Sequence, residues 1–246
     1  MSDEVGYRAC GSAGEGEAAP CFQAGSGAAG GGGVPDCRLC GRQVAGVGDA
    51  AVTGWEVRLR EGQQLYLKGQ RGDSIFVLRR GLVKETVPGA QGSERIARLV
   101  GPGGATGLAA MLQQSHRHGA QVISEGVACR VPAFRLSQAL RADPAVAGMV
   151  LAKWQGAIDD TDRVIGSFST GPARARLARF ILYLGDSVGR GARVRRREAA
   201  ELIGVTPVSV TRLLGEFKRE GLVSESGTRL QTWHAERLQA LAEPAA

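Results

Sequence analysis

The chain has 246 residues, enough for two modest domains, and a formal net charge of +7 at pH 7. The sequence has no apolar run of membrane-spanning length and no secretory signal pattern, so we expect a cytoplasmic protein with no membrane partner. Residues 171–246 hold 13 Lys and Arg against 8 Asp and Glu, which favours a polyanionic partner. The sequence also lacks H-E-x-x-H and G-x-x-x-x-G-K motifs, and we do not expect an enzyme.

Residues 1–45 differ from the rest of the chain. Ten of the first 36 residues are Gly and large apolar side chains are scarce, so we expect a flexible segment without a core of its own. It contains Cys10 and Cys21, followed by Cys37 and Cys40, whose spacing lets two thiolates share one metal or cluster. Five cysteines in a cytoplasmic chain argue against disulfides and leave metal ligation or redox sensing open.

Residues 46–136 show the short periodicity of β-strands. Apolar and polar residues alternate, or β-branched residues cluster, in EVRLR, QQLYLKG, SIFVLRRGLVKETV, ERIARLV and GAQVISEGVACRV. Strands of this length with glycines between them predict an antiparallel roll or barrel. Cys129 lies in the last strand, where a lone cysteine is more often a small buried apolar residue than a ligand.

Residues 137–170 contain a repeat that is typical of the seam between two helices, with steps of three and four. We predict a long helix that pairs in parallel with the same helix of a second copy, and packing against its own domain is the alternative. The predicted dimer interface consists of Leu151, Trp154, Ile158, Thr161, Ile165 and Phe168.

Residues 171–246 contain two short amphipathic helices joined by a tight turn. Apolar residues of the second helix recur at i, i+3, i+4 and i+7. Gly204 can end the first helix in a left-handed conformation, Thr206 can cap the second helix and Pro207 suits its first position. These features predict a helix-turn-helix, and two short β segments within residues 221–232 predict a wing.

The polar face of the second helix predicts contacts with double-stranded DNA. Arg212 can donate two hydrogen bonds to guanine O6 and N7, while Ser209, Thr211 and Lys218 can hold phosphates. A helical hairpin with a solvated basic face is the alternative. The predicted DNA-binding residues are Thr206, Val208, Ser209, Thr211, Arg212 and Lys218. A two-fold dimer would read a pseudo-palindromic site.

Four stretches carry a resemblance to a known family: IFVLRRGLVKE, VACRVPAFRL, ARARLARFILYL and GVTPVSVTRLLGEF. By these motifs the chain resembles the CRP/FNR superfamily of bacterial transcription regulators over residues 55–241, and within it the oxygen-sensing FNR branch. It implies an α+β fold: an N-terminal antiparallel β-roll like the jelly roll of cyclic-nucleotide-binding domains, a long dimerisation helix and a C-terminal winged helix-turn-helix. It also implies a homodimer that binds DNA and works with RNA polymerase. The family's recognition helix often carries a Glu where this chain has Val208, which can pack on a thymine methyl group.

FNR-type regulators hold a [4Fe–4S] cluster on three N-terminal cysteines and one cysteine of the roll, and the resemblance implies a cluster that senses oxygen or nitric oxide. By this resemblance Cys129 matches the internal ligand, and 88 residues separate it from Cys40. Cys37 and Cys40 are then two N-terminal ligands, and Cys21 is the third, with Cys10 as the spare. Fifteen residues part Cys21 from Cys37, where the family has a compact group. Zinc, a thiol switch or no ligand are the alternatives, because thiolates suit zinc as well as iron.

The stretch TGLAAMLQQSHRHGA matches the segment that binds cyclic AMP in CRP-like proteins. Leu108 stands where those proteins have Glu, and His118 and Gly119 stand where they have an Arg-Ser pair. A ribose and a cyclic phosphate would lack their acceptor and guanidinium, so we expect no cyclic nucleotide. We expect His116 and His118 to be surface residues, with haem or metal ligation as the alternative.

Overall fold

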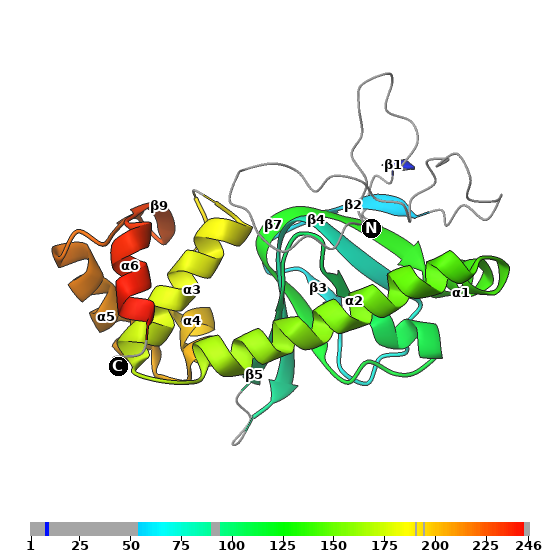
Figure 1. The fold of residues 1–246 in the computed structure, drawn as a ribbon, viewed down its shortest axis with the longest axis horizontal. Helices are drawn as coiled ribbons and strands as arrows, with labels where there is room; N and C mark the ends of the chain where they lie inside the picture. Colours follow the sequence, from blue (N-terminus) through cyan, green and yellow to red (C-terminus); the bar gives the residue numbers. More distant parts are fainter. Residues whose placement is uncertain (1–7, 10–53, 90–93, 190, 194, 244–246) are drawn as a thin grey trace, which may run out of the picture. The chain divides into compact units, whose positions relative to one another are not determined.

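The computed structural model describes residues 8–9, 54–89, 94–189, 191–193 and 195–243 (Figure 1). Its elements are β1 (Arg8–Ala9), β2 (Trp55–Leu59), β3 (Gln64–Tyr66), β4 (Ser74–Pro88), β5 (Glu94–Val100), β6 (Ala105–Thr106), η2 (Leu108–Leu112), β7 (Gly119–Pro132), α1 (Ala133–Ala142), α2 (Pro144–Arg163), η3 (Val164–Phe168), α3 (Ala173–Ser187), α4 (Arg196–Ile203), α5 (Pro207–Arg219), β8 (Val223–Ser226), β9 (Arg229–Trp233) and α6 (Ala235–Ala242).

The elements belong to two compact units, which are described separately. The first unit extends to Val83 and also contains Val100–Ala157. The second unit consists of Lys84–Leu99 and the chain from Ile158 onward. The predicted domain boundaries after residues 45, 136 and 170 stay predictions.

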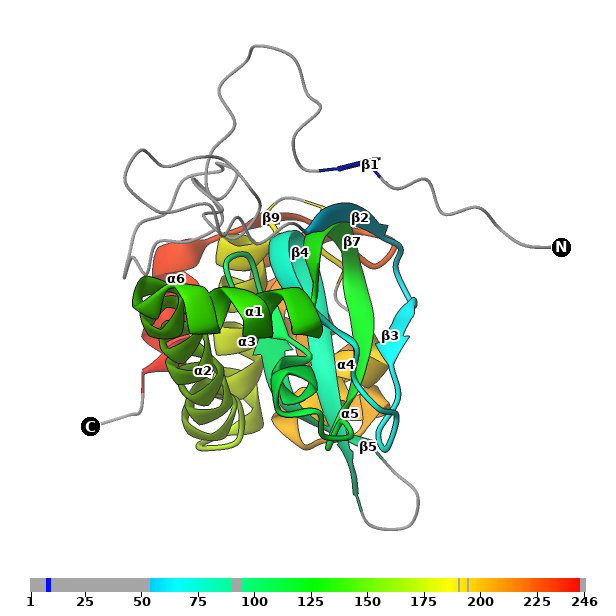
Figure 2. The ribbon, with the colours of Figure 1, turned by 90° about the vertical axis from the view of Figure 1, so that its right-hand side faces the viewer.

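An antiparallel sheet forms the roll, and its long strand β7, with 14 residues, lies in the first unit (Figure 2). The strand order is β1-β2-β7-β4-β5, with β3 added on β7 and β6 on β4. β2 pairs with one end of β7, where Trp55 faces Arg130, and β3 pairs with the other end, where Gln64 faces Gln121. The two short strands β2 and β3 therefore both pair with the long strand β7.

Two glycines allow β4 and β7 to approach each other closely. Gly81 has a φ of 94°, and a Cβ there would lie 2.8 Å from the Ser124 carbonyl oxygen. A Cβ on Gly126 would lie 2.0 Å from the Arg80 carbonyl oxygen. Real side chains do not tolerate such distances, so this crossing requires glycine on both strands.

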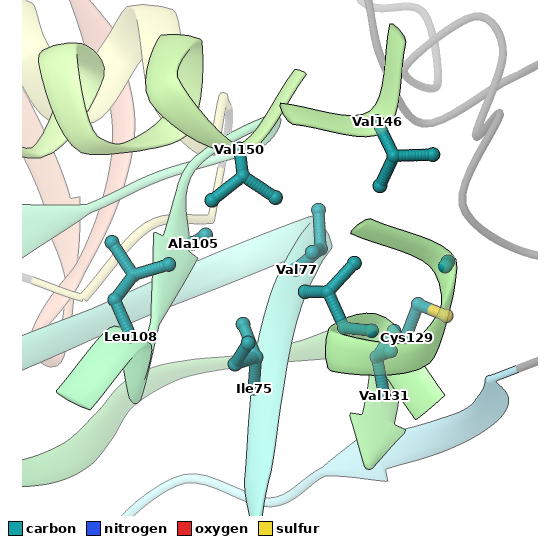
Figure 3. Close-up of a cluster of buried hydrophobic side chains, with 10 residues drawn as sticks. Ile75, Val77, Ala105, Leu108, Cys129, Val131, Val146 and Val150 are labelled. Carbon is teal, nitrogen blue, oxygen red and sulfur yellow. The ribbon is translucent and has the colours of Figure 1, made fainter. Parts of the chain in front are cut away.

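An apolar cluster joins the roll to the helices that follow it. In Figure 3, Val146 and Val150 of α2 point toward Val77 of β4, and Cys129 lies beside Val131. Asp143 precedes α2 and caps its N-terminus, because its Oδ1 accepts a 2.8 Å hydrogen bond from the Ala145 amide. The apolar cluster packs the first half of α2 against the roll.

The second unit has a helical core around α3. Helix α3 lies beside α6 (Figure 1) and also contacts α4 and α5. Fully or nearly buried side chains fill this core: Phe168, Leu177, Ile181, Leu184, Leu202, Ile203, Leu214, Phe217 and Leu222. Strands β8 and β9 form a two-stranded antiparallel wing directly after α5.

The predicted α+β class is confirmed, with an antiparallel N-terminal sheet and a C-terminal helix-turn-helix. The stripe predicted in the second helix of that motif is buried as expected, at 5% exposure or less for each residue. The predicted flexible segment, with Cys10, Cys21, Cys37 and Cys40, lies outside the described residues, which include only β1 from that region.

Candidate DNA-binding helix and sensor cysteine

The turn between α4 and α5 follows the conformation that the sequence predicts. Gly204 ends α4 with a φ of 67°, and its amide donates to the Ala200 carbonyl at 2.9 Å. Thr206 caps α5, because its Oγ1 accepts a 3.2 Å hydrogen bond from the Ser209 amide. Pro207 occupies the first position of α5. The cap at Gly204 therefore sets the end of α4, and the cap at Thr206 sets the start of α5.

Helix α5 exposes its polar face near its N-terminus. Val208 is 78% exposed, the largest exposure of any large apolar residue in the described chain. The Arg212 side chain is 71% exposed, and its Nη1 lies 3.5 Å from a Glu216 carboxylate oxygen. A pair at this distance on the surface contributes little and is readily exchanged for a base or phosphate contact. Both side chains are thus available to a ligand.

The hydroxyl groups on this face bond within their own helix. Thr206 Oγ1 and Ser209 Oγ are 3.0 Å apart, and Thr211 Oγ1 donates to the Pro207 carbonyl at 3.0 Å. These bonds hold the side chains close to the first turn of α5. Their roles at phosphates stay predictions.

Lys218, a predicted phosphate contact, forms an ion pair within its own domain, and its role at a phosphate stays a prediction. Its Nζ lies 2.6 Å from Glu225 of β8, whose side chain is 0% exposed. Arg196 of α4 donates to both oxygens of the same carboxylate, at 3.0 and 2.9 Å. Sequence reasoning missed Glu225, because an acidic residue in a short wing strand carries no pattern that marks it as buried.

Three predicted seam residues are exposed at intervals of seven. Leu151 and Ile158 on α2 are 63% and 55% exposed, and Ile165 in the π-helical turn η3 is 59% exposed. Large apolar side chains that repeat every seven residues on a helix surface suit a coiled seam. Trp154 instead packs partly against the apolar cluster of the roll, and Thr161 is half-buried.

Phe168 departs from the predicted seam. Its side chain is 1% exposed, and its ring meets those of Phe180 and Tyr183 edge-on at 6.1 and 5.8 Å. Burial raises the pKa of Tyr183 to about 12, and the charge of Asp160 adds to this effect. A side chain enclosed by its own chain is not available to a partner helix, so Phe168 belongs to the core of the second unit.

Cys129 is the candidate sensor residue within the described chain. Its side chain is 0% exposed and belongs to the apolar cluster that contains Val146 and Val150 (Figure 3). A Cβ on Gly54 would lie 2.6 Å from Cys129 Sγ, so only glycine leaves room for the sulfur there. Gly54 is also the first described residue after the cysteine-rich segment.

The other predicted cluster ligands, Cys21, Cys37 and Cys40, lie outside the described residues. Among the residues that the structure describes, no group of three or more His, Cys, Asp or Glu side chains is arranged to hold a metal ion. Of the four predicted cluster ligands, the structure therefore describes Cys129, and the Gly54 backbone lies close to its sulfur.

The prediction that His116 is a surface residue was wrong. The imidazole is 6% exposed and stacks on Tyr66, with 3.7 Å between the ring centroids. The backbone of His116 is held by the Gln70 carbonyl and the Gly69 amide, at 2.9 and 2.8 Å. His118 is half-buried. Tyr66, about 50 residues away in sequence, covers His116, and local pattern does not reveal such a partner.

In the segment that matches the cyclic AMP site, an apolar residue stands at the position of the family's Glu. Leu108 is 8% exposed and packs in the same cluster as Cys129. A pocket of about 220 Å³ in the roll is lined by other residues, among them Tyr66, His116 and Arg130. No helix of the described chain is both long enough and apolar enough to cross a membrane.

Two domain families match the chain in the order seen in the structure. Residues 56–143 match the cyclic nucleotide-binding domain, and residues 175–241 match the Crp-like helix-turn-helix domain. The first match covers the roll and α1, and the second extends from α3 to α6.

Curated relatives and solved structures agree with these matches. Electron transport regulator A of Shewanella oneidensis is 27% identical over 177 residues, which are 69% of this chain and 71% of the relative. The fumarate and nitrate reduction regulatory protein of Salmonella typhi is 26% identical over 192 residues, 75% of this chain and 77% of the relative. A CRP-family transcriptional regulator of Thermus thermophilus is 25% identical with a TM-score of 0.65, covering 75% of this chain and 95% of that one. FixK2 of Bradyrhizobium japonicum shares the fold at 23% identity and a TM-score of 0.67, covering 78% and 99% of the two chains. The chain therefore belongs to the CRP/FNR superfamily of transcription regulators.

Proposed function

We propose that this regulator is a cytoplasmic homodimer that binds a pseudo-palindromic DNA site through α5, and that it responds to oxygen through a [4Fe–4S] cluster on its cysteines. The observation that carries the sensing half is the position of Cys129. This thiol shares one apolar cluster with Val146 and Val150 of α2, the helix that continues to Ile158. Protein cores are close-packed, so a change at Cys129 is felt by that helix.

The cluster ligands would be Cys129 together with Cys37, Cys40 and Cys21. Thiolate sulfur is the usual ligand of iron–sulfur clusters, whose reaction with oxygen supplies the signal. Relatives named anaerobic regulatory protein, such as that of Haemophilus influenzae with 27% identity over 177 residues, support a signal connected with oxygen. Zinc, haem, thiol oxidation or the absence of any ligand are the competing interpretations of the same residues.

In this mechanism the chain shifts between a state that can dimerise and a state that cannot. A ligand that binds only the dimer-competent state increases the population of that state. The Cys129 thiolate would tie the N-terminal segment to the roll, and Val146 and Val150 would transmit the resulting packing to α2. The exposed Leu151, Ile158 and Ile165 would then meet their counterparts in a second copy, which sets two α5 helices at the spacing of two half-sites.

The exposed residues of α5 suggest how a half-site is read. Arg212 would donate to O6 and N7 of a guanine, the commonest specific contact in the major groove. Val208, 78% exposed, has no polar atom to accept from cytosine and would pack on a thymine methyl group. Selection of duplexes from a random library by the purified protein would test both contacts. A Val208→Glu variant is expected to move the preference at one base pair from thymine toward cytosine.

The sensing half is tested by purification without air. The protein is expected to be brown, to contain about four irons and four sulfides per chain, and to lose its colour and much of its DNA affinity in air. Cys129→Ser and the pair Cys37→Ser and Cys40→Ser should abolish both effects, whereas Cys10→Ser should not. A colourless protein with zinc would support the zinc alternative. Equal DNA binding with and without air would contradict oxygen sensing and leave DNA binding intact.

A further inference from the structure

A buried carboxylate connects the wing to both helices of the helix-turn-helix. Glu225 lies in β8, Arg196 is the first residue of α4 and Lys218 is near the end of α5. The Glu225 side chain is 0% exposed, whereas those of Arg196 and Lys218 are 25% and 40% exposed. Glu225 is therefore the enclosed centre of this three-residue group, and its two cations reach the surface.

The geometry of the wing explains why Glu225 points inward. The pairing of β8 with β9 shifts register between Ser224 and Glu225, so that Ser224 faces Thr232 and Glu225 faces Leu230. Such an irregularity changes the direction of a side chain relative to a regular strand. Leu230 is fully buried, and Glu225 lies on the same inner side of the wing.

The two cations keep this carboxylate charged. Burial by itself raises the pKa of Glu225, but hydrogen bonds from Arg196 and Lys218 outweigh burial and lower the pKa below its ordinary value. A buried charge without partners would be strongly unfavourable. The contact with Arg196 is bidentate, at 3.0 and 2.9 Å, which adds geometric restraint to the electrostatic attraction.

Other contacts hold the far strand of the wing to a different segment. Leu230 donates to the Ala192 carbonyl and accepts from the Gly191 amide, both at 2.8 Å. These bonds fix β9, and through its pairing also β8, to the loop before α4. The Glu225 group ties β8 directly to α4 and α5, and the Leu222 amide adds a backbone bond to the Phe217 carbonyl of α5 at 2.8 Å.

We infer that Glu225 is a positioning residue for DNA binding, which fixes the wing to α4 and α5, and that Lys218 serves as its partner and not as a phosphate contact. The inference rests on the proposed DNA binding by α5. It deepens that function, because wing and recognition helix would meet the duplex as one rigid surface. A wing fixed in advance avoids the entropy cost of ordering on binding.

The first test measures the wing without DNA. Full-length protein, purified without air, is compared with Glu225→Gln and Lys218→Met by hydrogen exchange of backbone amides. Glu225→Gln should speed exchange of the β8 amides on the order of tenfold, because a hydrogen bond to a charged group that ties β8 to α4 and α5 is lost. Amides of α3 should keep wild-type exchange, which shows that the domain is folded. Lys218→Arg keeps a cation in place and should preserve wild-type exchange. Wild-type wing exchange in Glu225→Gln would overturn the inference.

The second test measures how DNA affinity depends on salt, on a duplex selected by the wild-type protein. Lys218→Met should leave the slope of log K against log salt unchanged, whereas loss of a phosphate contact would reduce it by about one. Glu225→Gln should weaken binding on the order of tenfold, and the double variant should resemble it, because both changes disrupt one contact.

The two tests separate failure of the inference from failure of the proposed function. A slope reduced by about one in Lys218→Met, with normal wing exchange, would identify Lys218 as a phosphate contact and overturn the inference. A wild-type protein that binds no duplex would contradict the proposed function. The exchange measurement would still decide whether Glu225 holds the wing. If Glu225→Gln does not fold, Lys218→Met and Lys218→Arg decide the question, because Arg196 still gives the carboxylate a partner and both variants should fold. Faster exchange of the β8 amides in Lys218→Met than in Lys218→Arg supports the inference, and equal exchange in the two overturns it.

Discussion

Lys84 of β4 donates a 2.8 Å hydrogen bond to Glu201 of α4, and only 5% and 11% of the two side chains are exposed. The pair lies within the second unit, where it joins residues 84–99 to the first helix of the helix-turn-helix. Arg197 also binds Glu201 at 2.8 Å, but the Arg197 side chain is 80% exposed. The enclosed partner is therefore Lys84, and Arg197 is screened by solvent.

Lys84→Met tests the contribution of this pair to stability. The methionine keeps most of the aliphatic chain but leaves the Glu201 carboxylate with its exposed partner alone. We expect the free energy of unfolding to fall by about 1–3 kcal/mol, measured by urea denaturation. Lys68→Met, at an exposed position, is the matched control and should change stability by less than about 0.5 kcal/mol. Equal effects of the two changes would contradict a role for burial.

Arg212→Ala tests the recognition helix. The side chain is 71% exposed, so its removal should not affect folding. The loss of two hydrogen bonds to guanine should weaken binding to a selected duplex by about 1–3 kcal/mol and relax the preference at that base pair. Fluorescence anisotropy with labelled duplexes measures both effects. Arg237→Ala, an exposed arginine on α6, is the control and should retain most of the affinity. An unchanged base preference in Arg212→Ala would rule out direct readout by this residue.

Ile158→Glu tests the seam. Ile158 is 55% exposed in the single chain, so the variant should fold as a monomer, but a carboxylate without a partner is costly to bury between two helices. We expect the dimer dissociation constant to rise by a factor of about 100 or more, measured by analytical ultracentrifugation. Ala152→Glu adds the same charge at an exposed position on another side of α2 and should leave the dimer intact. A dimer of unchanged affinity in Ile158→Glu would place the interface elsewhere.

The raised pKa of Tyr183 predicts a loss of stability at high pH. Burial, with the charge of Asp160, raises its pKa to about 12, whereas tyrosines of an unfolded chain have a pKa of about 10. The unfolded state therefore loses this proton first, and stability should decline as pH rises from about 10 to about 12. Tyr183→Phe removes this contribution. Urea denaturation at several pH values measures the free energy of unfolding of the wild type and of Tyr183→Phe. The two free energies should diverge only between pH about 10 and about 12. Parallel plots of the free energy against pH would contradict the raised pKa.

Local spacing determined much of this protein before any tertiary contact was known. The cap at Thr206, the left-handed Gly204 and the apolar stripe of α5 each depend on residues within one or two helical turns. Backbone geometry acts over that range, so the sequence predicts the helix-turn-helix and the face of α5 that stays exposed, including Val208 and Arg212.

Contacts between residues far apart in the sequence decided the environment of other predicted residues. Phe168 follows the seam repeat, yet Phe180 and Tyr183 of α3 enclose it. His116 lies in a polar stretch, yet Tyr66 covers it. Lys218 has the charge of a phosphate contact, and local pattern did not reveal that Glu225 of the wing would be its ion-pair partner. In each case the local sequence pattern determines the direction of the side chain. The element that packs opposite the side chain determines whether it is exposed to solvent, buried in the core or held in an ion pair. Local sequence cannot supply this information, because burial depends on two surfaces and not on one.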